Sequence, residues 1–244
     1  MATFESHFPP MPSRTHEACG PSAHVFAYAF AGQVSRAKGN SVLWVREAWN
    51  SVQLNPLGFE TYLDPQQLLV AQAPSHIDVL ASAEEALRSG RVALVVMELS
   101  QSVGLTEGRR LQLAAQQGGS MGLCILPEGM GSNAAQTRWR CTPVFDPQEQ
   151  ADSTLQKWEL IKNKKGILGA WNVGWDSSSH NFTVVSASGG GARAAEQCNA
   201  RSGSPIRSSR DAQERLEALL DQRGSGSWGA HARSGTGRCT GDFS

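Results

Sequence analysis

Short apolar segments alternate with amphipathic helical segments between residues 15 and 145. The clearest apolar segment is 92–97, Val-Ala-Leu-Val-Val-Met, and a segment without polar residues is typical of a parallel strand that is covered on both faces. The clearest helix is 75–89, which places its apolar residues on one face and ends at Gly90. This alternation predicts an α/β fold with a doubly wound, mostly parallel sheet. The same pattern predicts helices at 25–34, 55–62 and 106–117, and strands at 41–45, 68–71 and 121–126.

The hydrophobic period changes to two from residue 137 onward, as expected for strands with one buried face. Turn residues at Lys165-Gly166 and Asp176-Ser177 separate the later segments. We therefore expect an antiparallel C-terminal extension of the parallel sheet. Its strands are predicted at 138–140, 158–162, 170–175 and 182–185, and most of their tryptophans are expected in the core.

The composition changes again near residue 186. Residues 186–244 contain ten glycines, eight arginines and no lysine. A segment so poor in large apolar residues buries too little surface to offset its chain entropy, so we expect a flexible tail with one helix at 211–222. A shifted reading frame is an open alternative for this stretch. The chain thus divides into an N-terminal arm (1–14), an α/β domain (15–185) and the tail (186–244).

Composition also restricts the class of protein. The formal net charge is zero, so the total charge does not predict non-specific binding to polyanions. No run approaches the roughly 18 apolar residues of a membrane span, and we expect no membrane association. No signal-peptide pattern is present and the five cysteines form no C-x-x-C pair, which favours a cytoplasmic protein with reduced thiols. The histidines show no metal-ligand spacing, so no metal is expected.

The sequence around Gly20, which Pro21 follows, partly matches a phosphate-binding loop, but the residues that would contact phosphate and Mg²⁺ are missing. When G-x-x-x-x-G-K-[ST] is aligned with Gly20, the second glycine falls on Val25, the lysine on Phe26 and the hydroxyl residue on Ala27. The lysine normally reaches the β- and γ-phosphates, and the hydroxyl holds Mg²⁺. We therefore expect no catalytic residues and no cofactor, because the missing groups disfavour the binding of ATP. An ordinary strand–turn–helix remains the alternative interpretation.

Glu98 ends the apolar segment 92–97, where an active NTPase carries a second acid that orients Mg²⁺ or water. Because the lysine and the hydroxyl are both missing here, we interpret Glu98 as a vestigial acid.

Cationic side chains gather at three places that are candidates for binding nucleic acid or a protein partner. One pair lies near the start of helix 106–117, which Thr106 is expected to cap, and there cations oppose the helix dipole. A second pair shares one strand face, and three lysines lie at a predicted hairpin tip. Pairing with acids inside the molecule, and lysines that protect an edge strand, are the alternatives. The candidates are Arg109, Arg110, Arg138, Arg140, Lys162, Lys164 and Lys165.

Several motifs together resemble the ImuA family of RecA-like proteins. They are E-x-x-G-P, V-L-W-V, E-E-A-L-R-x-G, L-T-x-x-R-R-L-Q-L-A-A, T-R-W-R and G-x-W-x-V-x-W. The resemblance covers roughly residues 14–185 and is most specific at 105–115 and 137–140.

The resemblance implies a non-catalytic accessory subunit in SOS-inducible translesion DNA synthesis. It implies as partners an ImuB-like protein related to Y-family polymerases and an error-prone DNA polymerase, with RecA and DNA as further candidates. Two alternatives are an inhibitor of the SulA type, which binds RecA or a cell-division protein, and an ATP-dependent recombinase-like DNA-binding protein.

Overall fold

A computed structural model describes residues 3–145 and 154–187 of the chain. All of them belong to the first of two compact units, Met1–Ala192. The predicted tail therefore lies outside the described residues apart from residues 186 and 187, and the helix predicted at 211–222 lies entirely outside them.

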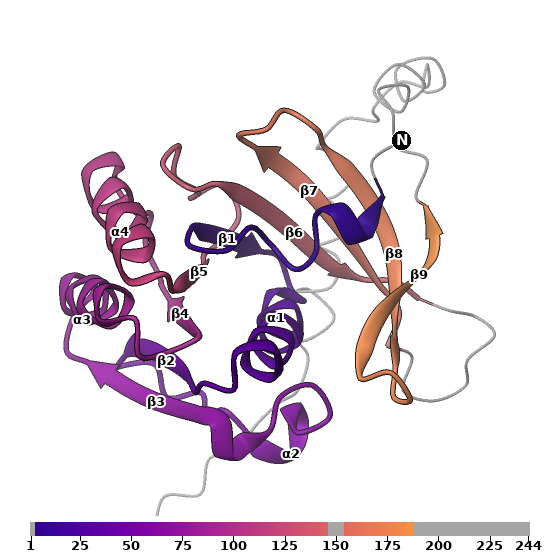
Figure 1. Ribbon diagram of the computed structural model, residues 1–244, viewed down its shortest axis with the longest axis horizontal. Coiled ribbons are helices and arrows are strands. Elements are labelled where there is room, and N and C mark those ends of the chain that lie inside the picture. Colours follow the sequence, from indigo (N-terminus) through magenta and orange to yellow (C-terminus); the bar gives the residue numbers. More distant parts are fainter. Residues whose placement is uncertain (1–2, 146–153, 188–244) are drawn as a thin grey trace, which may run out of the picture. The chain divides into compact units, whose positions relative to one another are not determined.

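The described residues form one nine-stranded sheet (Figure 1). Its strands are β1 (Thr15–Cys19), β2 (Val42–Glu47), β3 (Leu68–Ala73), β4 (Leu94–Glu98), β5 (Met121–Ile125), β6 (Thr137–Pro143), β7 (Gln156–Asn163), β8 (Gly169–Asp176) and β9 (Asn181–Ala187). Their order is β3-β2-β4-β5-β1-β6-β7-β8-β9. The six strands from β3 to β6 pair in parallel, and β7, β8 and β9 continue the sheet in antiparallel pairing. The predicted fold class, a mostly parallel sheet with an antiparallel C-terminal extension, is confirmed.

Helices cover both faces of the parallel part of the sheet. They are α1 (Ala23–Lys38), α2 (Pro56–Phe59), α3 (His76–Ser89) and α4 (Leu105–Gly118), with short 3₁₀ turns at Phe4–Ser6 and Pro65–Gln67. The connection from β1 to β2 runs across the sheet towards the β3 edge, and the connections from β3 to β4 and from β4 to β5 run in the opposite direction. Because such connections are right-handed, α1 lies on one face of the sheet, and α3 and α4 lie on the other (Figure 1). Within the described residues, none of these helices has the length and apolar character to cross a bilayer.

The start of α4 differs from the sequence prediction. Gly104 is the N-cap residue, and Thr106 lies inside the first turn without capping the helix. The Glu107 side chain, at the third position of the helix, folds back over Gly104. Arg109 and Arg110 therefore follow the first turn instead of belonging to it.

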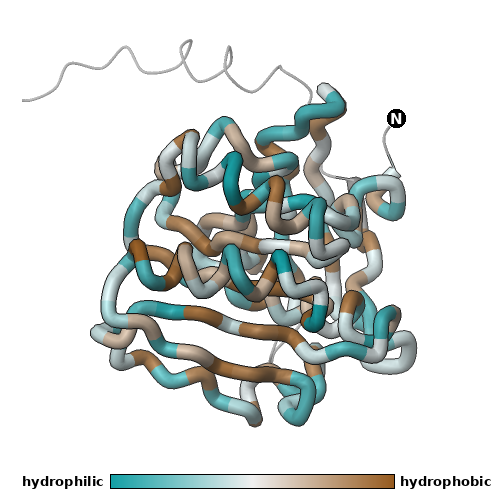
Figure 2. The backbone as a smooth tube through the Cα atoms, turned by 60° about the vertical axis from the view of Figure 1, so that its left-hand side comes forward, coloured by the Kyte–Doolittle hydropathy of each residue, from teal (hydrophilic) through white to brown (hydrophobic). Residues whose placement is uncertain are grey.

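Two hydrophobic clusters lie on the two faces of the sheet. One, under α3 and α4, is mainly aliphatic, and the other, under α1, is rich in aromatic rings. Trp139 and Trp158 are fully buried in the second cluster. Phe4 and Phe8, from the segment predicted as an arm, pack against Trp158 with ring centroids 6.0 and 5.0 Å away. Figure 2 shows the underlying pattern: apolar stretches run along the strands, whereas the helices alternate apolar and polar residues.

Candidate functional site

The turn between β1 and α1 occupies the place of a phosphate-binding loop but is tightly closed. Only Gly20, Pro21 and Ser22 lie between the strand and the helix. Gly20 has a φ of +92°, and a β-carbon there would lie 2.5 Å from the Cys141 carbonyl oxygen. The Ser22 N–H donates to that same oxygen at 3.1 Å. The turn is thus packed onto β6, and it does not form an open cradle of N–H groups around an anion.

The residues that align with the reactive part of the loop lie inside α1. Phe26, at the lysine position, has no exposed surface, and its ring centroid lies 4.9 Å from that of Trp158 and 5.3 Å from that of Trp139. Ala27 is also fully buried, and Val25 packs partly buried against the same cluster. The lysine position therefore faces the aromatic core, away from the carboxyl ends of the strands.

A cleft of about 460 Å³ opens at the carboxyl ends of β1, β2, β4 and β5. In doubly wound sheets this edge is where ligands bind, because connections to opposite faces diverge there. The charged and polar side chains that line it are His24, Glu47, Asn50, Glu98, Ser100 and Glu128. The cleft is therefore acidic, and no lysine or arginine among residues 3–145 and 154–187 contributes to its lining.

Among these side chains, Glu98 has the largest number of hydrogen-bond and ionic partners. Its Oε1 accepts hydrogen bonds from Asn50 Nδ2 at 2.9 Å and Arg46 Nη2 at 3.2 Å, and its Oε2 accepts from Trp44 Nε1 at 3.1 Å. His24 Nε2 lies 3.4 Å from Oε1. Burial alone would raise the pKa of Glu98, but hydrogen bonds from His24 and Trp44 and the charge of Arg46 lower it below its usual value. The carboxylate thus links β2, β4 and α1.

The sequence indicated Glu98 but none of its partners. Arg46 and Asn50 are separated from it by 52 and 48 residues, and only the β2–β4 pairing brings them together. The histidine at position 24 gave no signal, because no metal-type spacing surrounds it.

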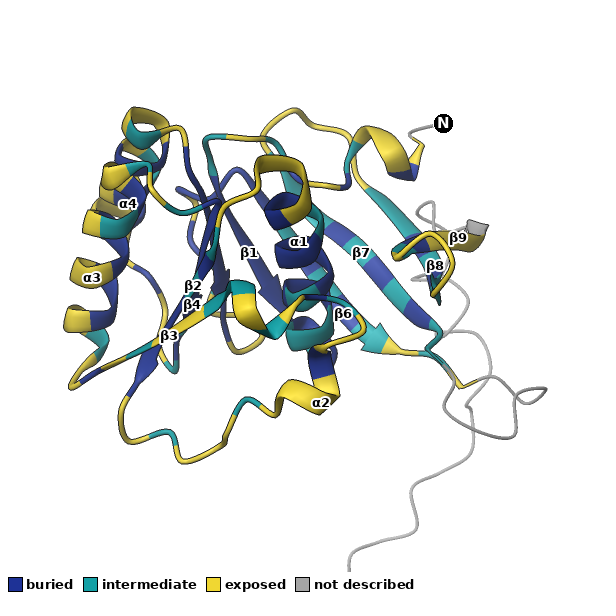
Figure 3. Cartoon of the chain, turned by 60° about the horizontal axis from the view of Figure 1, so that its bottom comes forward, coloured by how far each residue is buried: buried dark blue, intermediate teal, exposed yellow. Residues whose placement is uncertain are grey.

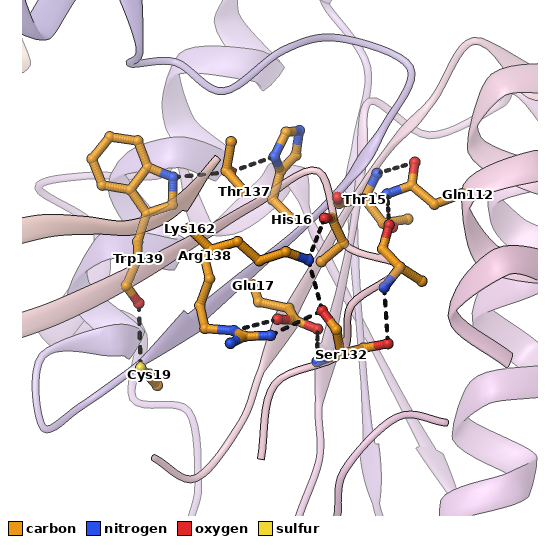
Figure 4. A network of polar contacts seen from close by, with 12 residues as sticks. Thr15, His16, Glu17, Cys19, Gln112, Ser132, Thr137, Arg138, Trp139 and Lys162 are labelled. Atoms are coloured by element: carbon orange, nitrogen blue, oxygen red, sulfur yellow. Dashed lines mark hydrogen bonds and ion pairs between the residues drawn. The ribbon is translucent and has the colours of Figure 1, made fainter. Parts of the chain in front are cut away.

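Arg138, one of the candidate binding residues, forms an ion pair inside the molecule (Figure 4). Its Nε lies 2.7 Å from Oε2 of Glu17, a carboxylate that is almost completely buried. Glu17 Oε1 also accepts the Ser132 N–H at 2.8 Å, and Arg138 Nη2 donates to the Ser132 carbonyl at 2.9 Å. Arg138 therefore fixes the loop between β5 and β6 against β1.

Lys162 and Lys164 bind the same loop from β7 and from the turn that follows it. Lys162 Nζ donates to the carbonyls of Ser132 at 2.9 Å and Ala135 at 2.8 Å, and Lys164 Nζ donates to the Ala134 carbonyl at 2.6 Å. Burial lowers the pKa of Lys162, although the nearby carboxylate of Glu17 opposes that shift. These two lysines and Arg138 thus come together around one loop.

The other candidate cations lie elsewhere. Arg140 pairs with Glu128 at 2.9 Å in a largely exposed contact, and Arg110 pairs with Glu84 of α3 at 2.8 Å. Arg109 is exposed, and its side chain has no hydrogen bond or ion pair within the described part of the chain. Lys165 is exposed at the tip of the β7–β8 hairpin. The pKa of His7 is lowered mainly by desolvation, and the nearby positive charge of Lys165 lowers it further.

Across residues 3–145 and 154–187, no group of three or more histidine, cysteine, aspartate or glutamate side chains is arranged to hold a metal ion.

No protein-family model matches the chain. The chain is similar to Protein ImuA of Caulobacter vibrioides, both in strain NA1000 / CB15N and in strain ATCC 19089 / CIP 103742 / CB 15. Each relative is 29% identical over 182 residues, an alignment that covers 65% of this chain and 72% of the relative. These relatives confirm the resemblance to the ImuA family.

Proposed function

We propose, from the similarity to ImuA, that this chain is a non-catalytic RecA-fold accessory protein of damage-inducible mutagenesis. In this role it binds or regulates an ImuB-like protein and an error-prone DNA polymerase during translesion synthesis in the cytoplasm. The observation that carries the non-catalytic part is the burial of Phe26, at the position of the loop lysine, in the aromatic core.

The chemistry of the carboxyl-edge cleft supports the same proposal. Glu47, Glu98 and Glu128 line it, and within the part of the chain that the structure describes His24 is its one basic side chain. A nucleoside triphosphate carries several negative charges, and its phosphates would meet carboxylates where an active loop presents a lysine and N–H groups. The Ser22 N–H is also already bonded to the Cys141 carbonyl. We therefore propose that nucleotide neither binds nor turns over in this cleft.

Equilibrium titration with a fluorescent ATP analogue and Mg²⁺, together with an ATP-turnover assay, tests this part of the proposal. We expect no saturable binding by the full chain and no turnover above a blank. Turnover that disappears in Glu98→Gln but persists in Glu60→Gln, which changes an exposed carboxylate outside the cleft, would establish an active ATPase instead. Such a result would favour the recombinase-like alternative.

A further inference from the structure

Strand β3 forms an edge of the sheet. It pairs in parallel with β2 over its whole length, from Val42↔Leu68 to Glu47↔Ala73, and no other described strand pairs with it (Figure 1). In a β-ladder, about half of the N–H and C=O groups of each strand point to either side. The outer side of β3 therefore presents a row of backbone donors and acceptors to a further strand.

Unlike most edge strands, β3 lacks features that discourage pairing. Its sequence, Leu-Leu-Val-Ala-Gln-Ala, contains no charge and no proline, and its register with β2 has no shift. Leu69 and Val70 are 51% and 52% exposed, and as neighbours on a strand they point to opposite faces. Figure 3 shows the exposed residues of β3 beside the buried β2 and β4. The edge thus offers both backbone groups and apolar side chains to a partner.

An exposed aromatic residue, Trp49, follows β2 near the carboxyl end of β3. The Ala48 N–H donates to the Ala73 carbonyl at 2.8 Å, and Trp49, which follows Ala48, is 65% exposed. Trp49 therefore lies on the β2 side of β3, where it lines the carboxyl-edge cleft, and the outer edge is formed by β3 alone.

The charge around β3 indicates which kind of strand would bind. No lysine or arginine occurs between Arg46 and Arg88. This stretch contains six carboxylates, at Glu47, Glu60, Asp64, Asp78, Glu84 and Glu85. An exposed acid therefore precedes β3 in the sequence, at Asp64, and another follows it, at Asp78.

This distribution disfavours a second copy of the chain as the occupant. Antiparallel pairing of two β3 strands would bring Asp64 of one copy towards Asp78 of the other, and like charges in such positions repel. A partner strand with lysines or arginines at its ends has the complementary charge.

We propose that the outer edge of β3 is a docking site for an extended segment of a partner protein, apolar at its centre and basic at its ends. The segment adds a strand to the sheet: its backbone pairs with β3, its apolar side chains cover Leu69 and Val70, and its basic ends face the flanking acids. This inference goes beyond the proposed function. It rests on the exposed edge of β3 and the charges around it, and it does not depend on a role in DNA mutagenesis.

The test uses the full chain and a short fluorescent peptide in which threonine alternates with valine and isoleucine between two pairs of lysines. We expect saturable binding by fluorescence anisotropy and slower hydrogen exchange at the amides of residues 68–73. A peptide of the same sequence with N-methylated amides along one edge should not bind, because it cannot pair with the backbone.

Two matched variants locate the contact. Val70→Lys places a charge on the edge and should weaken peptide binding roughly tenfold. Leu113→Lys adds the same charge to an exposed aliphatic position of α4, away from the flanking acids, and should change the affinity by less than about twofold. If circular dichroism shows that Val70→Lys is unfolded, Leu69→Lys takes its place.

Several results would overturn the proposal. They are failure of the folded chain to bind the lysine-flanked peptide, equal binding of the N-methylated peptide, and equal effects of the two lysine variants. Self-association in sedimentation equilibrium that Val70→Lys abolishes would also overturn it, since the edge would then belong to a second copy. None of these results depends on nucleotide binding, so they are distinguishable from a failure of the proposed function.

Discussion

His16 is fully buried in β1 and has both ring nitrogens engaged. Its Nε2 donates to the Met11 carbonyl at 2.8 Å, and its Nδ1 accepts from Thr137 Oγ1 at 2.7 Å. The same hydroxyl oxygen accepts a hydrogen bond from Trp139 Nε1 at 3.2 Å. This chain of hydrogen bonds requires a neutral imidazole, and burial, the main cause, lowers the pKa of His16 to about 4.

We predict that the protein loses stability between pH 7 and pH 5 because of His16. Its pKa is 6.5 in the unfolded chain and about 4 in the folded one, so the unfolded state takes up a proton first as the pH falls. This contribution is fully present above pH 6.5 and decreases towards pH 4, by about 2 kcal/mol between pH 7 and pH 5. Urea unfolding at both pH values measures it. His16→Gln should be less stable at pH 7 but should lack most of this pH dependence, and an unchanged dependence would contradict the assignment.

Arg138 and Arg140 provide a second test, since both belong to β6 and both pair with a glutamate. Arg138→Ala would leave the buried Glu17 carboxylate without its ion pair, and we expect a loss of about 3 kcal/mol in unfolding free energy. Arg140→Ala removes a largely exposed pair and should cost less than about 1 kcal/mol. Urea denaturation of both variants measures the two losses. Equal losses would show that the buried Arg138–Glu17 pair stabilises the fold no more than the exposed Arg140–Glu128 pair.

The sequence alone could not separate these two arginines. Their spacing predicts that they share a strand face, and the structure has Trp139 buried between them. Glu17, however, is 121 residues from Arg138 in the sequence and meets it only through the parallel pairing of β1 with β6.

At the scale of elements, the early start of α1 explains why the turn after β1 is short and does not form an open phosphate-binding loop. The helix begins at Ala23, directly after the three-residue turn, so Phe26 faces the core. We predict that Phe26→Lys does not restore nucleotide binding and lowers the unfolding free energy by about 3 kcal/mol or more, because an ammonium replaces a buried ring. Val25→Lys, at a partly buried neighbour, should cost less. Unfolding curves and ATP-analogue titration test both variants, and nucleotide binding by Phe26→Lys would refute this account of the helix.

The β7–β8 hairpin yields a prediction about nucleic acid. Lys162 and Lys164 are occupied by loop carbonyls, whereas Lys165 of the hairpin and Arg109 of α4 are exposed. If the chain contacts DNA phosphates, Lys165→Ala and Arg109→Ala should each reduce the slope of log affinity against log salt by about 1. Electrophoretic or anisotropy titrations at several salt concentrations measure this slope. Affinity that is independent of salt would exclude phosphate contacts by these residues.

Most elements were predictable because their apolar periodicity is local, as in β4 and α3. The exception is β1, Thr-His-Glu-Ala-Cys, which has little apolar character although every residue in it is buried. It lies between β5 and β6, and its polar side chains find partners such as Thr137 and Arg138 from distant parts of the chain. A central strand of this kind cannot be identified from hydrophobicity.

At the scale of the described unit, the parallel and antiparallel parts share one sheet and one aromatic cluster. Phe26 of α1 meets Trp139 and Trp158 there, and Phe8 of the N-terminal segment packs beside them. The change of hydrophobic period near residue 137 predicted an antiparallel extension of the parallel sheet, and the pairing of β6 with both β1 and β7 confirms that the two parts are continuous. That continuity packs the turn of Gly20 against Cys141 of β6.

The proposed accessory role requires the chain to bind its partner directly. Co-expression of the tagged full chain with the ImuB-like protein, followed by affinity purification and size-exclusion chromatography, tests it most directly. We predict that the two proteins co-elute as a stable complex without added nucleotide. Separate elution of two folded proteins would contradict the accessory role and would favour an inhibitor that binds RecA or a cell-division protein.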